Sequence, residues 1–168
     1  MTSSDTVSVL FVCLGNICRS PLAEGVFQAL AMESDLADRF RVDSAGTGAY
    51  HVGEAPDPRS VAVAREHGVQ LTGLARQVTP RDLTIFDWVV AMDESNRRSL
   101  RGLEGPAGGN RRVVLLRDFD PESPGADVPD PYYGGVDGFE RVFQIVDRSC
   151  RNFLDEISGQ VQARSFGG

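Results

Sequence analysis

The organisation of this chain follows from the stretch Cys13-Leu14-Gly15-Asn16-Ile17-Cys18-Arg19-Ser20, which comes directly after the mostly apolar residues 7–12. Residues 7–12 predict a buried strand, and Pro21 predicts a helix start, because proline at the first helical position loses no hydrogen bond. In a loop between such a strand and helix, backbone N–H groups turn inward, and the helix N-terminus adds partial positive charge. The stretch therefore predicts a cradle that binds a phosphate group and favours the thiolate form of Cys13.

Three side chains of this loop have chemistry that suits the hydrolysis of a phosphate ester. A Cys13 thiolate can attack phosphorus in line and form a cysteinyl-phosphate intermediate. Arg19 can contact two phosphoryl oxygens with its planar fork of donors. Ser20 can donate its hydroxyl to the departing sulfur, or it can act as a plain helix N-cap. A structural cysteine beside an arginine that caps a turn would give the same short pattern. The preceding strand and the following helix start are what favour a phosphate-binding loop.

A second motif, Asp130-Pro131-Tyr132-Tyr133-Gly134-Gly135, lies far downstream in a segment rich in Pro and Gly. Asp130 can protonate a leaving phenolate and then act as a base toward water, although an Asp-Pro pair also starts turns. Tyr132 and Tyr133 predict an aromatic wall for a flat phenyl ring, and Tyr50 and His51 can complete that wall. Surface packing of the loop would also account for the two neighbouring tyrosines.

Composition limits the class of protein. The 168 residues suit one domain, and a net charge of −7 with a pI of about 4.8 argues against nucleic-acid and anionic-membrane partners. Three cysteines without a Cys-x-x-Cys pair, and two isolated histidines, argue against a disulfide framework and a metal site. No apolar run has the length of a membrane span. We therefore expect a cytoplasmic protein that needs no metal and no cofactor.

Strand-like and helix-like segments alternate along the chain, which predicts a parallel sheet with helices on both faces. We expect an α/β fold: a single three-layer domain with a central four-stranded parallel sheet and a phosphate-binding loop after the first strand. The expected strands are residues 7–12, 40–43, 88–91 and 113–116. The expected helices are residues 21–33, 58–67, 94–100 and 138–157.

Two long loops, residues 46–57 and 118–138, separate these elements. We expect both to flank the Cys13 loop, because sites in α/β folds form outside the carboxyl ends of the strands. The single phosphatase domain is expected to span residues 1–159, and residues 160–168 are expected to form a flexible tail.

Together, the two motifs resemble those of the low-molecular-weight protein tyrosine phosphatases of bacterial type. The resemblance extends from about Val7 to Ile157. It includes the further stretches Asp43–Thr47, Pro56–Arg59, Ala75–Val78 and Ala91–Asn96. The resemblance implies an enzyme that hydrolyses phosphotyrosine in protein substrates, and we expect it to be a monomer or to self-associate weakly.

The resemblance also implies roles for individual positions. Leu14, Gly15, Ile17 and Cys18 belong to the phosphate-binding loop, and the family uses the positions of Asn16 and Ser44 to support it. Asp93 matches a family position, although a helix N-cap explains it equally well. Gly73 departs from many eukaryotic relatives, which carry a histidine that supports the loop. This departure concerns the bracing of the loop and not its chemistry.

Two other functions use a similar cysteine loop. Thiol-dependent arsenate reductases share the fold but need further downstream cysteines, and here only Cys150 follows, on an apolar helix stripe. A phosphocysteine carrier is the third reading, against which Asp130 argues because it favours hydrolysis. Cys18 can either resolve an oxidised Cys13 by forming a disulfide or simply pack beneath the loop.

Overall fold

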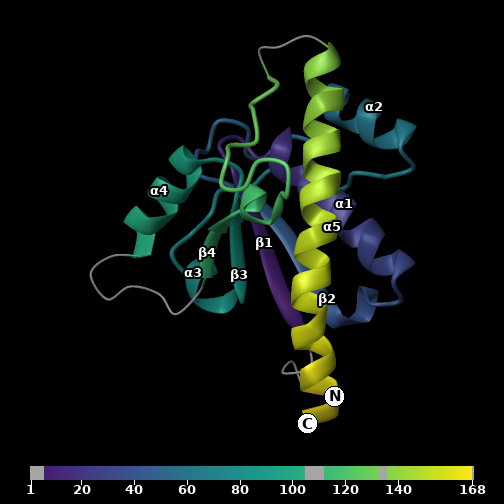
Figure 1. The fold of residues 1–168 in the computed structure, drawn as a ribbon. Coiled ribbons are helices and arrows are strands. Elements are labelled where there is room, and N and C mark those ends of the chain that lie inside the picture. The colour runs from purple at the N-terminus through teal and green to yellow at the C-terminus, as the bar shows by residue number, and fades with distance from the viewer. Residues whose placement is uncertain (1–5, 105–111, 133–135, 168) are drawn as a thin grey trace.

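Four parallel strands form one sheet in the described residues, 6–104, 112–132 and 136–167, of the computed structural model (Figure 1). The strands are β1 (Val7–Cys13), β2 (Phe40–Gly46), β3 (Trp88–Ala91) and β4 (Arg112–Leu115). Their order across the sheet is β2-β1-β3-β4, so β1 occupies an inner position and all its residues are buried. The predicted four-stranded parallel sheet is confirmed.

Helices cover both faces of this sheet. The helices α1 (Arg19–Glu33), α2 (Pro58–Glu66) and α5 (Val136–Gly167) lie on one face, and α3 (Asp82–Ile85) and α4 (Glu94–Glu104) lie on the other (Figure 1). Successive side chains of a strand point to opposite faces. Accordingly, Phe11 packs in the cluster that includes α1 and α5, whereas Leu10 and Val12 pack in the cluster that includes α3 and α4. This arrangement confirms the predicted three-layer α/β fold.

Several helices and strands begin or end at residues that differ from those predicted from the sequence. β2 continues to Gly46 rather than ending at residue 43, because its last residues also pair with β1. The other differences are β1 to Cys13, α1 from Arg19, α2 to Glu66, β4 over 112–115, α4 to Glu104 and α5 over 136–167. The sequence pattern does not predict α3, η2 (Ala37–Arg39) or η3 (Leu116–Phe119), because such short helices show little apolar periodicity. The flexibility of residues 160–168 stays a prediction.

Several aromatic rings meet in the core between β1, α1 and α5. The ring centroid of Phe11 lies 5.8 Å from that of Phe27 and 6.4 Å from that of Phe153. Cys150 is fully buried in the same cluster, with its Sγ 3.9 Å from the carbonyl oxygen of Ala23, and burial raises the pKa of its thiol. Cys150 is therefore a core residue, as its place on an apolar stripe predicts. None of the helices in the described residues is long and apolar enough to span a membrane.

Candidate active site

The loop between β1 and α1 encloses the Cys13 sulfur at the carboxyl edge of the sheet. Cys13 is 2% exposed, and its Sγ accepts a hydrogen bond of 3.3 Å from the backbone N–H of Asn16. Asn16 has a φ of 58°, a left-handed conformation that Asn adopts more readily than most residues. Two backbone hydrogen bonds fix the start of this loop to the segment that follows β2. The N–H of Thr47 donates to the Cys13 carbonyl oxygen, and the N–H of Gly48 donates to the Leu14 carbonyl oxygen.

The hydroxyl of Ser20 is the second polar contact of the Cys13 sulfur. Its oxygen lies 3.0 Å from Sγ, and it also accepts a bond of 2.9 Å from Asn16 Nδ2. Because Asn16 donates to this oxygen, the one hydroxyl proton of Ser20 is left for the sulfur. Helix α1 has no side-chain N-cap, so the geometry favours the sulfur contact of Ser20 over the capping role.

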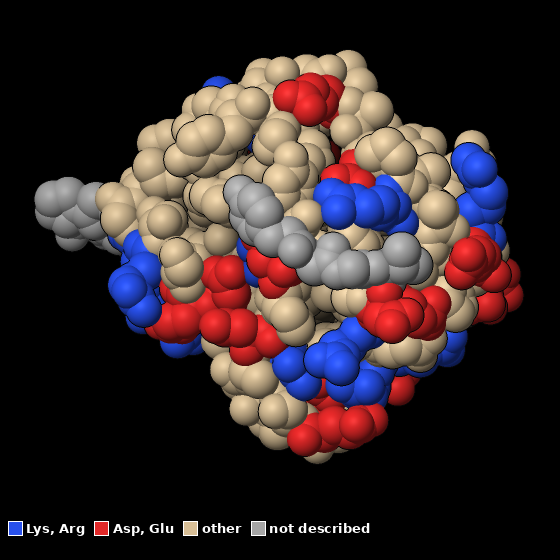
Figure 2. Space-filling view, turned by 90° about the horizontal axis from the view of Figure 1, so that it is seen from above, with Lys and Arg blue, Asp and Glu red and all other residues tan. Residues whose placement is uncertain are grey.

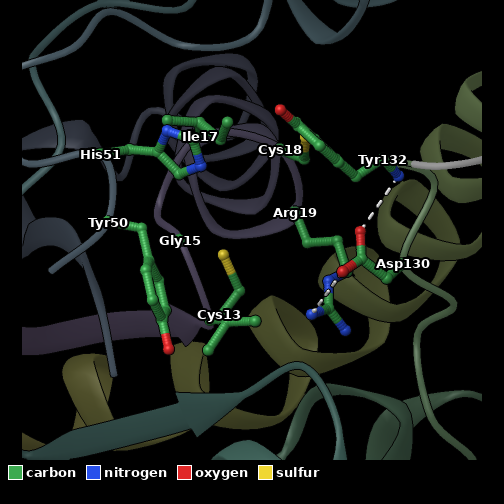
Figure 3. Close-up of a pocket in the computed structure, with 10 residues that line it drawn as sticks. Cys13, Gly15, Ile17, Cys18, Arg19, Tyr50, His51, Asp130 and Tyr132 are labelled. Atoms are coloured by element: carbon green, nitrogen blue, oxygen red, sulfur yellow. Dashed lines mark hydrogen bonds and ion pairs between the residues drawn. The ribbon is translucent and has the colours of Figure 1, made fainter. Parts of the chain in front are cut away.

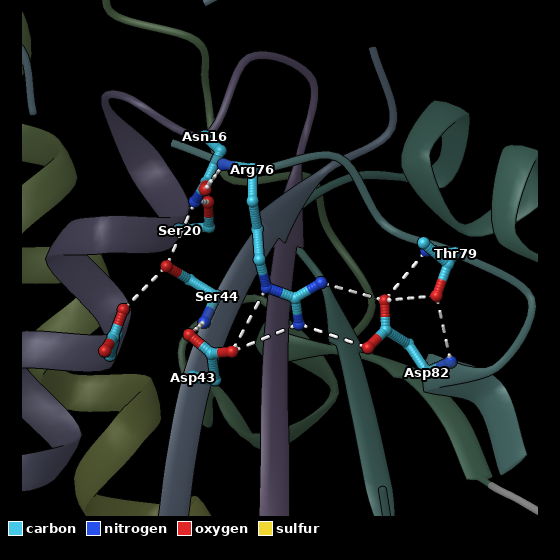
Figure 4. Close-up of polar contacts among 8 residues, drawn as sticks. Asn16, Ser20, Asp43, Ser44, Arg76, Thr79 and Asp82 are labelled. Carbon is cyan, nitrogen blue, oxygen red and sulfur yellow. Dashed lines mark hydrogen bonds and ion pairs between the residues drawn. The ribbon is translucent and has the colours of Figure 1, made fainter. Parts of the chain in front are cut away.

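A polar network behind the loop fixes Asn16 (Figure 4). Asn16 Nδ2 donates to Ser44 Oγ at 3.0 Å, and Asn16 Oδ1 accepts from the backbone N–H of Arg76 at 2.9 Å. Ser44 Oγ in turn donates to Glu24 Oε1 at 2.6 Å. Each polar atom of the Asn16 amide therefore has a defined partner, and the amide orientation follows from them.

Glu24 and Gly73 lie next to Ser44, which supports the loop through Asn16. Gly73 lies beside a small polar cavity of about 100 Å³ that Glu24 and Ser44 also line, and its φ of 90° suits glycine. No atom lies within 4 Å of a Cβ placed on Gly73. Burial raises the pKa of Glu24, whereas its hydrogen bond from Ser44 acts in the opposite direction. Here Ser44 is held by a carboxyl group on α1 rather than by a side chain at position 73.

Arg19 carries the positive charge of the site. Its Nη1 donates to Asp93 Oδ2 at 2.7 Å and to the Val128 carbonyl oxygen at 3.0 Å. Burial tends to lower the pKa of Arg19, but Cys13, Asp93 and Asp130 together raise it. Asp93 also caps α4, because its Oδ1 accepts from the backbone N–H of Asn96 at 2.7 Å. Asp93 is thus the N-cap that the sequence predicts, and its other carboxylate oxygen contacts Arg19.

Asp130 lies across the pocket from the loop. Its Oδ2 is 3.6 Å from Arg19 Nη2, and its Oδ1 accepts from the backbone N–H of Tyr132 at 3.1 Å (Figure 3). The Asp130 side chain is 40% exposed, so it can meet both solvent and a bound molecule. Figure 3 shows Tyr50 and Asp130 on opposite sides of the Cys13 sulfur.

These groups line one pocket of about 390 Å³. Its lining residues are Cys13, Leu14, Gly15, Ile17, Cys18, Arg19, Tyr50, His51, Asp130 and Tyr132. Of the other predicted site residues, Asn16, Ser20 and Ser44 do not line the pocket but form the polar network around the loop, and Tyr133 lies outside the described residues. The pocket therefore brings both sequence motifs and both predicted long loops together.

The charge of the pocket differs from that of the outer surface. Figure 2 shows acidic and basic side chains next to one another across the face seen from above. In the pocket, Arg19 is the one Lys or Arg among the described lining residues. The groups of the pocket that can face an anion are thus Arg19 and the backbone N–H groups of the loop, in a chain whose net charge is −7. No three His, Cys, Asp or Glu side chains of the described residues gather as a metal site requires.

Comparison with known proteins gives the family. The family model described as low molecular weight phosphotyrosine protein phosphatase matches residues 8–163. The chain belongs to this family. It is 44% identical over 162 residues to a low molecular weight protein-tyrosine-phosphatase of Streptomyces coelicolor, which covers 95% of this chain and 99% of that protein. It is 42% identical over 158 residues to the pig low molecular weight phosphotyrosine protein phosphatase, which covers 94% and 99%.

A solved structure agrees with this phosphatase family and its fold. The crystal structure of protein tyrosine phosphatase from Entamoeba histolytica, with Hepes in the active site, matches with a TM-score of 0.87 and 36% identity. The match covers 92% of this chain and 99% of that chain. The predicted resemblance to the low-molecular-weight phosphatases is therefore confirmed.

Several polar groups of this phosphatase site do not follow from its two sequence motifs. Glu24 and Arg76 reach Asn16 and Ser44 from other elements, and Val128 contributes only its carbonyl oxygen to Arg19. Asp57 is recognisable in the sequence as the N-cap of α2, which it is, because its side chain accepts from the backbone N–H of Arg59. Nothing local in the sequence places Asp57 against the phosphate loop.

Proposed function

We propose that this chain is a cysteine-dependent protein tyrosine phosphatase that hydrolyses phosphotyrosine and aryl phosphates through a cysteinyl-phosphate intermediate. The observation that carries the proposal is the position of the Cys13 sulfur. It lies at the floor of an open pocket, between two hydrogen-bond donors, with Arg19 and Asp130 beside it. Family membership supports the same reaction.

In the first step, the Cys13 thiolate attacks phosphorus and the phenolic oxygen of the substrate departs. Arg19 Nη1 already donates to Asp93 and Val128, so Nε and Nη2, the latter 3.6 Å from Asp130, are the donors that can meet two phosphoryl oxygens. These donors stabilise the charge that spreads over the equatorial oxygens in the transition state. Asp130 gives its proton to the departing phenolate, which would otherwise be a poor leaving group.

In the second step, water attacks the phosphocysteine and the Cys13 sulfur departs as a thiolate. The Asp130 carboxylate accepts a proton from this water. The Ser20 hydroxyl, 3.0 Å from Sγ, and the Asn16 N–H stabilise the sulfur as it regains its negative charge. The phosphate that forms then leaves, and the free thiolate is restored.

The walls of the pocket suit a phenyl ring above the phosphate. Tyr50, whose side chain is exposed, and Tyr132 rise beside the loop, and Ile17 and Leu14 add apolar surface. A flat aromatic ring fills such a slot and places its phosphate at the floor. We assign Tyr132, Tyr50 and, beyond the described residues, Tyr133 to substrate binding.

We further propose the setting in which the enzyme acts. Residues 1–159 form the catalytic unit, and the enzyme is a monomer or self-associates weakly. It dephosphorylates proteins in the cytoplasm, and it binds neither nucleic acid nor membranes. The acidic net charge of −7 supports the last point, because polyanions repel such a surface.

The test is hydrolysis of p-nitrophenyl phosphate by the wild type and by Cys13→Ser, with arsenate reduction measured alongside. The variant should lose turnover by several orders of magnitude and still bind a phosphate analogue, because backbone groups form much of the cradle. Cys150→Ser is the matched control, because Cys150 lies in the core and should leave turnover in place. Residual hydrolysis within about tenfold of wild type would remove Cys13 as the nucleophile. Thiol-dependent arsenate reduction, or a stable phosphocysteine without hydrolysis, would instead support one of the two other functions.

A further inference from the structure

Asp57 connects the phosphate loop to helix α2. Its backbone N–H donates to the Ile17 carbonyl oxygen at 2.8 Å, and its side chain is 7% exposed. The Cys18 thiol lies beside its carboxyl group, and burial together with Asp57 raises the pKa of Cys18 to about 12. A buried carboxylate in this place needs a cation, because an unpaired charge beside the loop would be poorly solvated.

Arg59 supplies that cation with well-defined geometry. Its Nε donates to Asp57 Oδ1 at 3.0 Å and its Nη2 donates to Oδ2 at 2.9 Å, which makes a two-pronged ion pair. These hydrogen bonds hold the pKa of Asp57 below its usual range. The pair fixes the plane of the guanidinium relative to the loop that Asp57 supports.

The same guanidinium lies over two aromatic rings, that of Tyr132, which lines the pocket, and that of the core residue Phe139. Its central carbon is 5.4 Å from the ring centroid of Tyr132 and 4.6 Å from that of Phe139, which belongs to α5. Such distances allow a cation–π contact with each ring. Arg59 therefore touches both the support of the phosphate loop and the segment that carries Asp130.

Tyr132 transmits this contact to the carboxyl group of Asp130. Its backbone N–H donates to Asp130 Oδ1 at 3.1 Å, and the other oxygen of Asp130 lies 3.6 Å from Arg19 Nη2. A shift of Tyr132 would move this N–H and with it the direction of the acid. The contacts run without a break from Ile17 through Asp57, Arg59 and Tyr132 to Asp130.

From these contacts we infer that Arg59 is a positioning residue for the general acid: it holds Tyr132, and through Tyr132 the Asp130 carboxyl group, at a fixed place over the phosphate loop. The inference rests on the proposed function, because it assigns Arg59 to the step in which Asp130 protonates the leaving group. A lysine would keep the charge but not the planar fork that pairs with Asp57 while stacking on the rings.

The test compares Arg59→Ala and Arg59→Lys with Arg65→Ala, an exposed arginine of the same helix. For each protein, kcat/KM is measured with an activated aryl phosphate and with phenyl phosphate, whose leaving group needs the proton far more. The ratio of the two values does not depend on how much of the sample is folded. It should change by roughly tenfold in both Arg59 variants, a part of what a general acid supplies, and should not change in Arg65→Ala.

A second measurement uses the Asp130→Asn background. In this background, adding Arg59→Ala should not change the ratio of the two kcat/KM values any further, because the acid through which Arg59 acts is already absent. An unchanged ratio in Arg59→Ala, or a further change of the ratio in the double variant, would overturn the inference. The proposed function fails separately, namely when wild-type hydrolysis does not depend on Cys13.

Discussion

The Ser20 hydroxyl oxygen lies 3.0 Å from the Cys13 Sγ. Because this oxygen accepts a hydrogen bond from the Asn16 amide, the hydroxyl proton of Ser20 can point at the sulfur. This orientation is imposed from behind the loop, since Asn16 itself is held by Ser44 and by the Arg76 backbone. The donor is thus in place before the sulfur becomes charged, so little reorganisation is needed when the phosphocysteine breaks.

Ser20→Ala should slow the second chemical step more than the first. We expect kcat to fall about 10–100-fold, because a hydrogen bond to a charged group contributes about 1.5–3 kcal/mol. Stopped-flow measurements with p-nitrophenyl phosphate should then show a burst of phenolate followed by slow turnover. Ser158→Ala, on α5 outside the pocket, serves as the control. Slow phenolate release without a burst would place the effect of Ser20 in the first step.

Asp130→Asn should make the rate depend more strongly on the leaving group. We expect a loss of about 100-fold or more in kcat for leaving groups of high pKa, within the range that general acids contribute. Activated aryl phosphates should lose much less, because their phenolates leave without a proton. A loss of equal size for every leaving group would exclude Asp130 as the acid.

Phosphotyrosine peptides should be better substrates than phosphoserine and phosphothreonine peptides. The sulfur of Cys13 lies at the floor of the pocket between Tyr50 and Tyr132, and a short alkyl phosphate reaches this floor less well. The measurement is kcat/KM for matched peptides that differ only in the phosphorylated residue. Comparable values for phosphoserine and phosphotyrosine would contradict the assignment of the aromatic walls.

Cys18 should protect Cys13 from irreversible oxidation. Peroxide should convert the Cys13 thiolate to a sulfenic acid, which the Cys18 thiol converts to a disulfide with release of water. Bound phosphate should protect the enzyme, and a dithiol should restore activity. Because the pKa of Cys18 is raised to about 12, disulfide formation should become faster at alkaline pH, where more thiolate is present.

Cys18→Ser is the variant that tests this role. It should remain active but should not recover after peroxide treatment. Recovery as complete as that of the wild type, or the absence of a linked Cys13–Cys18 peptide in mass spectrometry, would leave Cys18 as a packing residue beneath the loop. Cys150→Ser, in which the core thiol is changed, should recover normally.

Asp120→Asn should destabilise the fold at neutral pH. Asp120 is fully buried between Arg148, Arg117 and the N–H of Glu122, and these contacts hold its pKa well below the usual range. Its stabilising effect is therefore complete above the ordinary carboxyl pKa of about 4 and is lost as the pH falls through its lower folded-state value. We expect a loss of about 3 kcal/mol at pH 7, because the two partly buried arginines lose their charged partner in the core.

Urea unfolding of the wild type and the variant as a function of pH tests this prediction. The difference in the free energy of unfolding should be constant from pH 6 to 8 and should shrink below about pH 4. Glu122→Gln is the control, since Glu122 is largely exposed. If the difference in the free energy of unfolding grew as the pH fell, it would contradict the stabilising role of the ionised Asp120 carboxylate.

Features that depend only on neighbouring residues could be predicted from the sequence. The phosphate loop is contiguous from Cys13 to Ser20, so its strand, turn and helix start can be recognised without knowledge of the rest of the chain. The same holds for the strand at residues 88–91, which the structure reproduces. The ends of β2, α4 and α5 were predicted less well, because pairing and packing with distant elements extend them beyond the local pattern.

The groups that support the loop and contact Asp130 follow only from the tertiary structure. Ser44 reaches Asn16 across 28 positions of sequence, and Asp93 reaches Arg19 across 74. Parallel strands bring their carboxyl ends to one edge of the sheet, so residues that follow different strands meet there whatever their separation along the chain. The partners of each donor then depend on distances of a few tenths of an ångström, which no spacing in the sequence encodes.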